Sequence, residues 1–160
     1  MFKFKDCFNY LTDNEIDLKI LKKVEKENTI NKAPTYVYAI ILNNHCTFVG
    51  KIDLKIGDVS NNNILMGGNI NYHIEEEFKN NNYEFEACLL LEEVALSHDM
   101  EFLTIACSFN DEKKKLIIEM LGYQYCDTIE VEKGTSAYLL GYRLRTLYEK
   151  NLTKKNIRRR

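Results

Sequence analysis

The fold of this chain is decided by the stretch from residue 68 to residue 107, which reads GNINYHIEEEFKNNNYEFEACLLLEEVALSHDMEFLTIAC. Residues 68–74 predict a strand, and a polar loop with three successive asparagines at 80–82 follows it. Residues 83–98 predict a helix that is apolar on two sides and therefore packs deeply. Residues 102–107 are nearly all apolar, as expected for a strand covered on both faces. The stretch therefore predicts a βαβ unit at the centre of the domain.

Upstream of this unit, the sequence predicts a helix and a hairpin. Residues 12–15 (TDNE) have the pattern of a capping box, and apolar residues at helical spacing follow, so we expect a helix over about 12–27. Residues 36–42 and 47–56 are rich in β-branched and aromatic side chains. With the asparagine turn at 43–44 between them, they predict an antiparallel hairpin.

Downstream of the unit, a helix and a second hairpin are predicted. Asn110 and Asp111 are suited to cap a helix that ends at Gly122. Residues 123–131 and 136–144 predict the last hairpin, whose exposed second strand is expected to offer an edge for a possible homodimer. The order of all these elements predicts an α+β domain.

The composition is that of one ordinary globular domain. With 160 residues, 45% hydrophobic and 29% charged, the chain is expected to fold as a single domain over residues 1–149, followed by a basic tail at 150–160. Turn chemistry is unusual, because seven glycines and one proline stand against seventeen asparagines. Asparagine tolerates a left-handed backbone, so it is expected to make many of the tight turns. An A+T-rich genome is a neutral explanation for the same bias.

Charge is distributed unevenly along the chain. The last eleven residues carry +6, and since the net charge is −2, the rest of the chain carries −8. A nucleic-acid-binding surface is expected to be basic on the folded body. We therefore interpret the tail as a solvated end and expect no nucleic-acid partner.

The sequence has no signal for metal binding, disulfides or membrane insertion. Five widely spaced cysteines form no C-x-x-C pair, and three histidines lie far from metal-ligand spacing, so we expect reduced thiols and no metal. There is no apolar N-terminal segment and no apolar stretch long enough to span a bilayer. The protein is therefore predicted to be cytoplasmic, with no membrane partner.

Several short motifs follow one another at a family-like spacing. Residues 70–74 (INYHI), 79–84 (KNNNYE) and Glu86-Ala87 are similar to a strand Ile-Gly-Tyr-x-Ile, a loop Arg-Gly-x-Gly-Tyr-Ala, and the helix start Glu-Ala. Residues 119–123 (EMLGY) are similar to Glu-Lys-Leu-Gly-Phe. In these motifs the chain resembles the GNAT superfamily of N-acetyltransferases, and the order of elements matches over roughly residues 10–145.

The resemblance implies a GNAT-like, mixed and mostly antiparallel sheet of about six or seven strands flanked by helices. It also implies an N-acetyltransferase that moves an acetyl group from acetyl-CoA to a primary amine of a small molecule or a protein N-terminus, by direct attack. The cosubstrate would lie where the strand ending at Ile74 splays from the strand ending at Cys107. Carried over by position, the coenzyme-binding residues are Ile74 and Glu75 for pantetheine and acetyl, Asn110, and, for the diphosphate, Lys79, Asn80, Asn81, Asn82, Tyr83 and Glu84.

The loop also departs from the family pattern. Asn80 and Asn82 replace glycines, which adds side chains where a phosphate approaches closely, and Glu84 replaces a small residue. A carboxylate suits an empty helix N-terminus but opposes a bound diphosphate. These residues favour a second hypothesis, a catalytically silent GNAT-fold binding or regulatory module. Lys79 and the order of the elements favour the enzyme.

No side chain stands out as a general base, so each candidate has a structural alternative. His73 could relay a proton beside the expected acetyl site, although a lone strand histidine is more often packed or solvated. Tyr123 or Tyr125 could protonate a leaving thiolate, although such residues usually pack. The acidic run 75–77 would attract a cationic amine or form a solvated loop. The lysine run 113–115 forms the outer face of a helix or reaches a phosphate.

Overall fold

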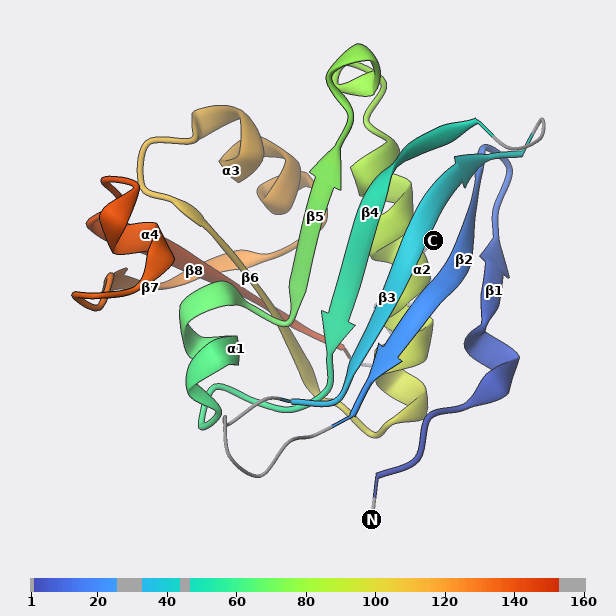
Figure 1. Ribbon diagram of the computed structural model, residues 1–160, viewed down its shortest axis with the longest axis horizontal. Helices are drawn as coiled ribbons and strands as arrows, with labels where there is room; N and C mark the ends of the chain where they lie inside the picture. The colour runs from blue at the N-terminus through green and yellow to red at the C-terminus, as the bar shows by residue number, and fades with distance from the viewer. Residues whose placement is uncertain (1, 26–32, 44–46, 153–160) are drawn as a thin grey trace.

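The strands of the chain form a single mixed sheet. The computed structural model describes residues 2–25, 33–43 and 47–152 (Figure 1). Its eight strands lie in the order β1-β2-β3-β4-β5-β6-β8-β7, and within the described residues only the pair β5/β6 is parallel. The strands are β1 Tyr10–Thr12, β2 Ile16–Val24, β3 Thr35–Leu42, β4 Phe48–Lys55, β5 Ile70–Ile74, β6 Phe102–Ser108, β7 Gln124–Glu130 and β8 Leu144–Asn151. The predicted α+β class and mostly antiparallel sheet are confirmed, with eight strands instead of six or seven.

Four α-helices and two 3-10 turns complete the described part of the chain. The helices are α1 Asn62–Gly67, α2 Tyr83–Ser97, α3 Glu112–Met120 and α4 Ser136–Leu139, and the turns are η1 Asp6–Phe8 and η2 Glu76–Phe78. The predicted β5–α2–β6 unit, the β3/β4 strands and the Asp111-capped α3 are therefore confirmed. The predicted turn at 43–44 lies partly outside the described residues.

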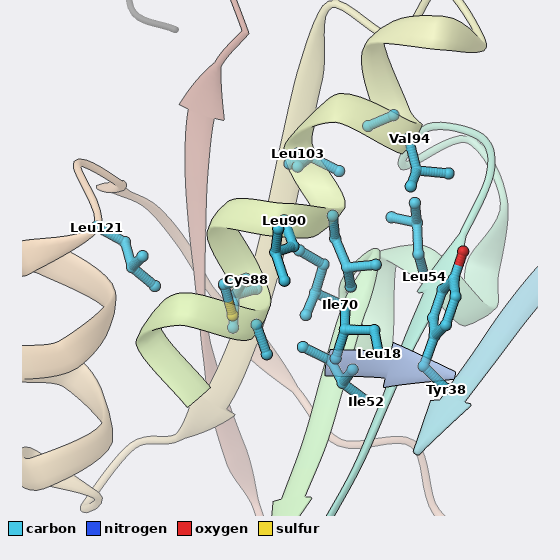
Figure 2. Packing of buried hydrophobic residues seen from close by; sticks show 14 of the residues in the cluster. Leu18, Tyr38, Ile52, Leu54, Ile70, Cys88, Leu90, Val94, Leu103 and Leu121 are labelled. Carbon is cyan, nitrogen blue, oxygen red and sulfur yellow. The ribbon is translucent and has the colours of Figure 1, made fainter. Parts of the chain in front are cut away.

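The hydrophobic core lies between α2 and one face of the sheet. Alternate side chains of the strands point to this face, and Leu18, Ile52 and Ile70 meet Leu90 and Val94 of the helix (Figure 2). Each such side chain contributes about 2 kcal/mol on burial. The deep packing predicted for this helix is confirmed, and it fixes α2 firmly beneath β5 and its neighbours.

The predicted helix over 12–27 is wrong, because residues 10–24 form the β1/β2 hairpin. Asp13 Oδ1 accepts hydrogen bonds from the N–H groups of Glu15 (2.8 Å) and Ile16 (2.9 Å), so the expected helix cap is a strand-connecting turn. Ile16 and Leu18 are fully buried on alternate positions, and β2 pairs with β3 along its whole length. Pairing with β3 satisfies the backbone that a helix would have satisfied internally.

The predicted strand over 136–144 is also wrong. Residues 136–139 form α4, and the strand that pairs with β7 is β8, which lies between β6 and β7. The edge strand proposed for a homodimer is therefore absent at 136–144. Strand β8 also includes Lys150, whose ammonium forms an ion pair with the buried Glu92, so the folded body extends past residue 149. The remainder of the predicted tail, residues 153–160, lies outside the described residues.

Thiols, metals and membrane spans can be checked in the same residues. Cys7, Cys88, Cys107 and Cys126 are free, and Cys46 lies outside the described ranges. In residues 2–25, 33–43 and 47–152, no three His, Cys, Asp or Glu side chains gather as a metal site. Within those ranges, no helix has the length and apolar character required to cross a membrane.

Candidate functional site

The candidate site is built on the separation of the two parallel strands. Strands β5 and β6 share one register pair, Ile70 with Ile105, beside an isolated bridge between Gly68 and Ile105. Beyond this point the ribbons diverge, β5 towards the loop before α2 and β6 towards α3 (Figure 1). At the closed end the backbones touch, since a Cβ on Gly68 would lie 2.8 Å from the Ala106 nitrogen. The splayed strands predicted from the sequence are therefore present.

The open edge of β5 carries backbone groups that β4 does not use. The N–H of Glu75 donates to the Val49 carbonyl at 2.8 Å. Hydrogen-bonded and non-hydrogen-bonded pairs alternate along an antiparallel ladder. Since Glu75 and Val49 are hydrogen-bonded, the next pair, Gly50 with Ile74, is a non-hydrogen-bonded pair. The N–H and C=O of Ile74 therefore point away from β4, into the opening. Ile74 and Glu75 are the two residues expected along pantetheine and acetyl. The Ile74 N–H is free to bind a ligand in the opening, whereas the Glu75 N–H is already bonded to β4.

A cleft of about 590 Å³ occupies the opening between β5 and β6. Its walls come from β5, the start of α2, α3 and the segment before β8. The lining residues are Tyr72, His73, Ile74, Lys79, Glu84, Asp111, Lys113, Lys114, Ile117 and Tyr142. Three residues predicted for the coenzyme site, Ile74, Lys79 and Glu84, therefore lie in one cleft, together with His73.

The asparagine loop turns the chain into α2. Asn82 has φ 60° and ψ 31°, the left-handed conformation that glycine adopts most readily, while Asn80 and Asn81 have negative φ. The side chain of Asn82 makes no capping hydrogen bond, and the Asn81 amide donates to the Tyr83 hydroxyl at 3.4 Å. Asparagine thus reproduces the backbone of the turn at one of the two replaced positions.

Glu84 lies buried in the first turn of α2, at the cleft wall. Its residue is 3% exposed, and its own backbone N–H donates to its carboxylate. Among the described residues, no hydrogen-bond partner reaches the buried Oε2 atom. Burial raises the pKa of this carboxyl, and the nearby charge of Lys113 opposes the rise. An internal carboxylate therefore already sits where an anion would meet the helix N-terminus.

Three lysines, one from the loop and two from α3, line the same cleft. Lys113 Nζ lies 3.3 Å from both the Lys79 carbonyl and Asn80 Oδ1, so it spans from α3 to the loop. Lys114 Nζ lies 4.9 Å from the ring centroid of Tyr72, and burial lowers the pKa of this ammonium. Lys79 Nζ pairs with Glu76 Oε2 at 2.8 Å. Two residues of the lysine run therefore line the cleft, and the reading of the whole run as an outer helix face is wrong.

The other predicted site residues lie apart from the cleft lining. Tyr123 is buried with a hydroxyl that no described residue hydrogen-bonds, and Tyr125 is 60% exposed with its hydroxyl 2.8 Å from Thr128 Oγ1. Asn110 is exposed, and its neighbour Asp111 lines the cleft instead. Of the three catalytic candidates, only His73 borders the cleft.

Sequence reasoning missed several residues of the cleft wall, among them Tyr142 and Ile117. Tyr142 reaches it from the turn after α4, a segment predicted as a strand. Ile117 reaches it from α3, one turn after Lys113. The helical spacing of Lys113, Lys114 and Ile117 on one face was the signal that would have placed α3 along the cleft.

Comparison with solved structures places this architecture among acetyltransferases. RimL, a ribosomal α-N-protein acetyltransferase in complex with coenzyme A, matches with a TM-score of 0.62 and 9% identity, over 87% of this chain and 95% of that chain. A GNAT-family acetyltransferase from Bacillus anthracis matches with a TM-score of 0.57 and 13% identity, over 72% of this chain and 66% of that one. MccE, a microcin self-immunity acetyltransferase in complex with acetyl-CoA and AMP, matches at 0.55 and 16% identity, over 73% of this chain.

These matches establish the fold. The chain has the fold of GNAT acetyltransferases, as the sequence motifs predicted, and at these identities the likeness concerns the fold alone. The match spans 61% of the length of the MccE chain. No family model and no curated protein sequence matches the chain.

Proposed function

We propose that this protein is an N-acetyltransferase that uses acetyl-CoA and a primary amine as substrates. The observation that carries the proposal is the free edge of β5, where the Ile74 amide points into a cleft that ends at the N-terminus of α2. The neighbours RimL and MccE, which share this fold, were solved with coenzyme A and with acetyl-CoA.

The residues of the cleft fit most of such a substrate. A pantetheine arm carries amide groups, and the exposed peptide edge of β5 offers matching donors and acceptors. The lysines at 79, 113 and 114 supply positive charge for phosphates. Glu84 is the poor fit, because its carboxylate lies at the amides that the diphosphate would use.

The proposed reaction requires one hydrogen-bond donor and one proton acceptor from this chain. Acetyl-CoA supplies a thioester, whose carbonyl carbon the amine nitrogen attacks while the carbon–sulfur bond breaks. The Ile74 N–H donates to the carbonyl oxygen and stabilises the negative charge that develops there. An imidazole nitrogen of His73 accepts the proton that the amine loses, and the thiolate takes a proton from solvent.

The acceptor is proposed as a primary amine of a small molecule or a protein N-terminus. A protein N-terminus is favoured by RimL, which modifies an α-amino group of a ribosomal protein. The segment around Tyr142 and the exposed face of His73 border the mouth through which such an amine would enter. The cytoplasmic location and the homodimer stay predictions.

Calorimetric titration with acetyl-CoA tests the cosubstrate directly. Heat and a thermal shift at submillimolar ligand are expected, and neither effect at millimolar ligand would contradict the proposal. Release of free thiol from acetyl-CoA in the presence of a panel of amines and N-terminal peptides then tests turnover. Acetyl-CoA binding without thiol release on any amine would support the second candidate.

The second candidate, a silent binding or regulatory module, rests on Glu84 and Asn80. A buried carboxylate at the α2 N-terminus and a side chain in place of a loop glycine both oppose a closely held diphosphate. Changing Asn80 and Asn82 to glycine separates the candidates further. Tighter binding with thiol release would identify a weakened enzyme, and tighter binding without release a silent module.

A further inference from the structure

We propose that Lys113 and Lys114 of α3, rather than the free amides of α2, bind the diphosphate of the ligand in the cleft. The identity of that ligand as a coenzyme A derivative rests on the proposed function. The assignment of the phosphates to α3 rests on the geometry of this chain alone.

The start of α2 already holds a carboxylate beside its first amides. The Glu84 carboxylate accepts a hydrogen bond from its own N–H in the first turn, and the residue is 3% exposed. A diphosphate placed on the same amides would lie against a buried anion, which costs far more than a repulsion through water. The helix N-terminus is therefore a poor phosphate site while this carboxylate is charged.

The lysines of α3 are arranged to replace those amides. The Lys113 ammonium rests 3.3 Å from two neutral oxygens, the Lys79 carbonyl and Asn80 Oδ1. These are long contacts, and phosphate oxygens make shorter, charge-assisted bonds to an ammonium, so the exchange is favourable. Lys113 thus stands at the entrance of the cleft on the side of the loop.

Lys114 adds a second cation deeper in the cleft. Within the described residues its Nζ has no ion-pair or hydrogen-bond partner, and it faces the ring of Tyr72. The carboxylate of Asp111, the N-cap residue of α3, accepts from the Lys114 backbone N–H. The Tyr72 hydroxyl is buried, and no described residue hydrogen-bonds it. An ammonium from α3 and a hydroxyl from β5, both without partners among the described residues, therefore match the oxygens of a phosphate bound between these two elements.

The charge of the cleft lining differs in sign from the net charge of the rest of the folded chain. The chain without its last eleven residues carries −8, yet this cleft is lined by three lysines and two acids. Lys79 also lines the cleft, where it pairs with the exposed Glu76, whereas Lys113 and Lys114 have no ion-pair partner among the described residues. A cationic cleft on an acidic body selects an anion and draws it towards α3.

The lysine run itself supplies a matched control. Lys113→Ala and Lys114→Met remove the two cations, and methionine keeps an apolar stem over Tyr72. Lys115→Ala removes the next lysine, which pairs with Glu112 at 3.6 Å, contacts Phe109 and lies outside the cleft lining. Binding of coenzyme A and of inorganic pyrophosphate is measured by calorimetry at fixed ionic strength, after thermal unfolding shows that each variant folds.

Each cleft variant is expected to weaken binding of both ligands about tenfold or more, and Lys115→Ala to leave both within about twofold. The proposal is overturned if both cleft variants bind like Lys115→Ala, or if pyrophosphate fails to bind the unchanged protein. If pyrophosphate binds and the cleft variants weaken it while coenzyme A and acetyl-CoA fail to bind, the anion site stands and the proposed function falls.

Discussion

Asn69 and Thr104 share four hydrogen bonds at the closed end of the cleft, and in one of them the Asn69 N–H donates to the Thr104 hydroxyl oxygen at 3.1 Å. Asn69 Oδ1 accepts from the N–H and the hydroxyl of Thr104, each at 2.9 Å, and the Asn69 N–H donates to the Thr104 carbonyl at 2.8 Å. The Asn69 amide also donates to the carbonyls of Lys55 and Gly57. One buried side chain therefore ties β4, β5 and β6 together just before β5 and β6 part.

Replacing this asparagine is expected to destabilise the whole domain. Asn69→Leu leaves buried backbone groups of three segments without partners, and we expect a loss of about 3 kcal/mol in the free energy of unfolding. Thr104→Val removes one hydroxyl and keeps the shape, so about 1 kcal/mol is expected. Urea unfolding of both variants measures the difference. Equal losses would show that the asparagine amide has no special role.

Gly50 is expected to be intolerant of any side chain. A Cβ there would lie 2.1 Å from the His73 carbonyl oxygen, so β5 must shift next to Ile74. Gly50→Ala is expected to cost about 3 kcal/mol, because backbone cannot yield as a side chain does. Gly134→Ala is the control, since its Cβ meets nothing within 4 Å and only its positive φ of 85° costs about 1 kcal/mol. A Gly50 variant as stable as this control would contradict the geometry.

Glu84 is expected to make stability depend on pH. Its pKa is raised in the folded protein, so its contribution is fully favourable below the ordinary value of 4.5 and is lost as pH rises through the raised pKa. Glu84→Gln is therefore expected to raise the Tm at pH 8 by about 3 °C, equivalent to about 1 kcal/mol, and to have a smaller effect below pH 4.5. Glu77→Gln, at an exposed position of η2, should shift the Tm at neither pH. A Tm gain that is equal at both pH values would show that charge is not the cause.

Removing one partner of the ion pair between Glu92 and Lys150 is expected to destabilise the fold, whereas removing both partners is expected to cost little stability. Both side chains are largely buried, at 3% and 13% exposure. Lys150→Met leaves a buried carboxylate without its partner and should cost about 3 kcal/mol. Glu92→Met combined with Lys150→Met removes both charges and should restore most of the stability. A double variant as unstable as Lys150→Met alone would show that the packing of the lysine stem matters more than its charge.

The central unit was predictable because each of its parts carries a local pattern. Alternation in 68–74, two-sided apolarity in 83–98 and the apolar run at 102–107 each fit one kind of element. The hairpin of β1 and β2 was not predictable in this way, because the spacing of Ile16 and Ile20 fits a helix and a strand equally. Pairing with β3, which lies far along the chain, decides between them.

The sequence by itself determined the order of the central elements and the asparagine turn before α2, since these follow from local periodicity and backbone preference. Only the tertiary structure decided which charges meet in the cleft. Burial of Glu84 and the rotation of α3 that brings Lys113 and Lys114, but not Lys115, to the cleft wall depend on packing between segments some thirty residues apart. A charged residue on a helix looks the same in sequence whether it faces water or a ligand, and packing alone distinguishes the two.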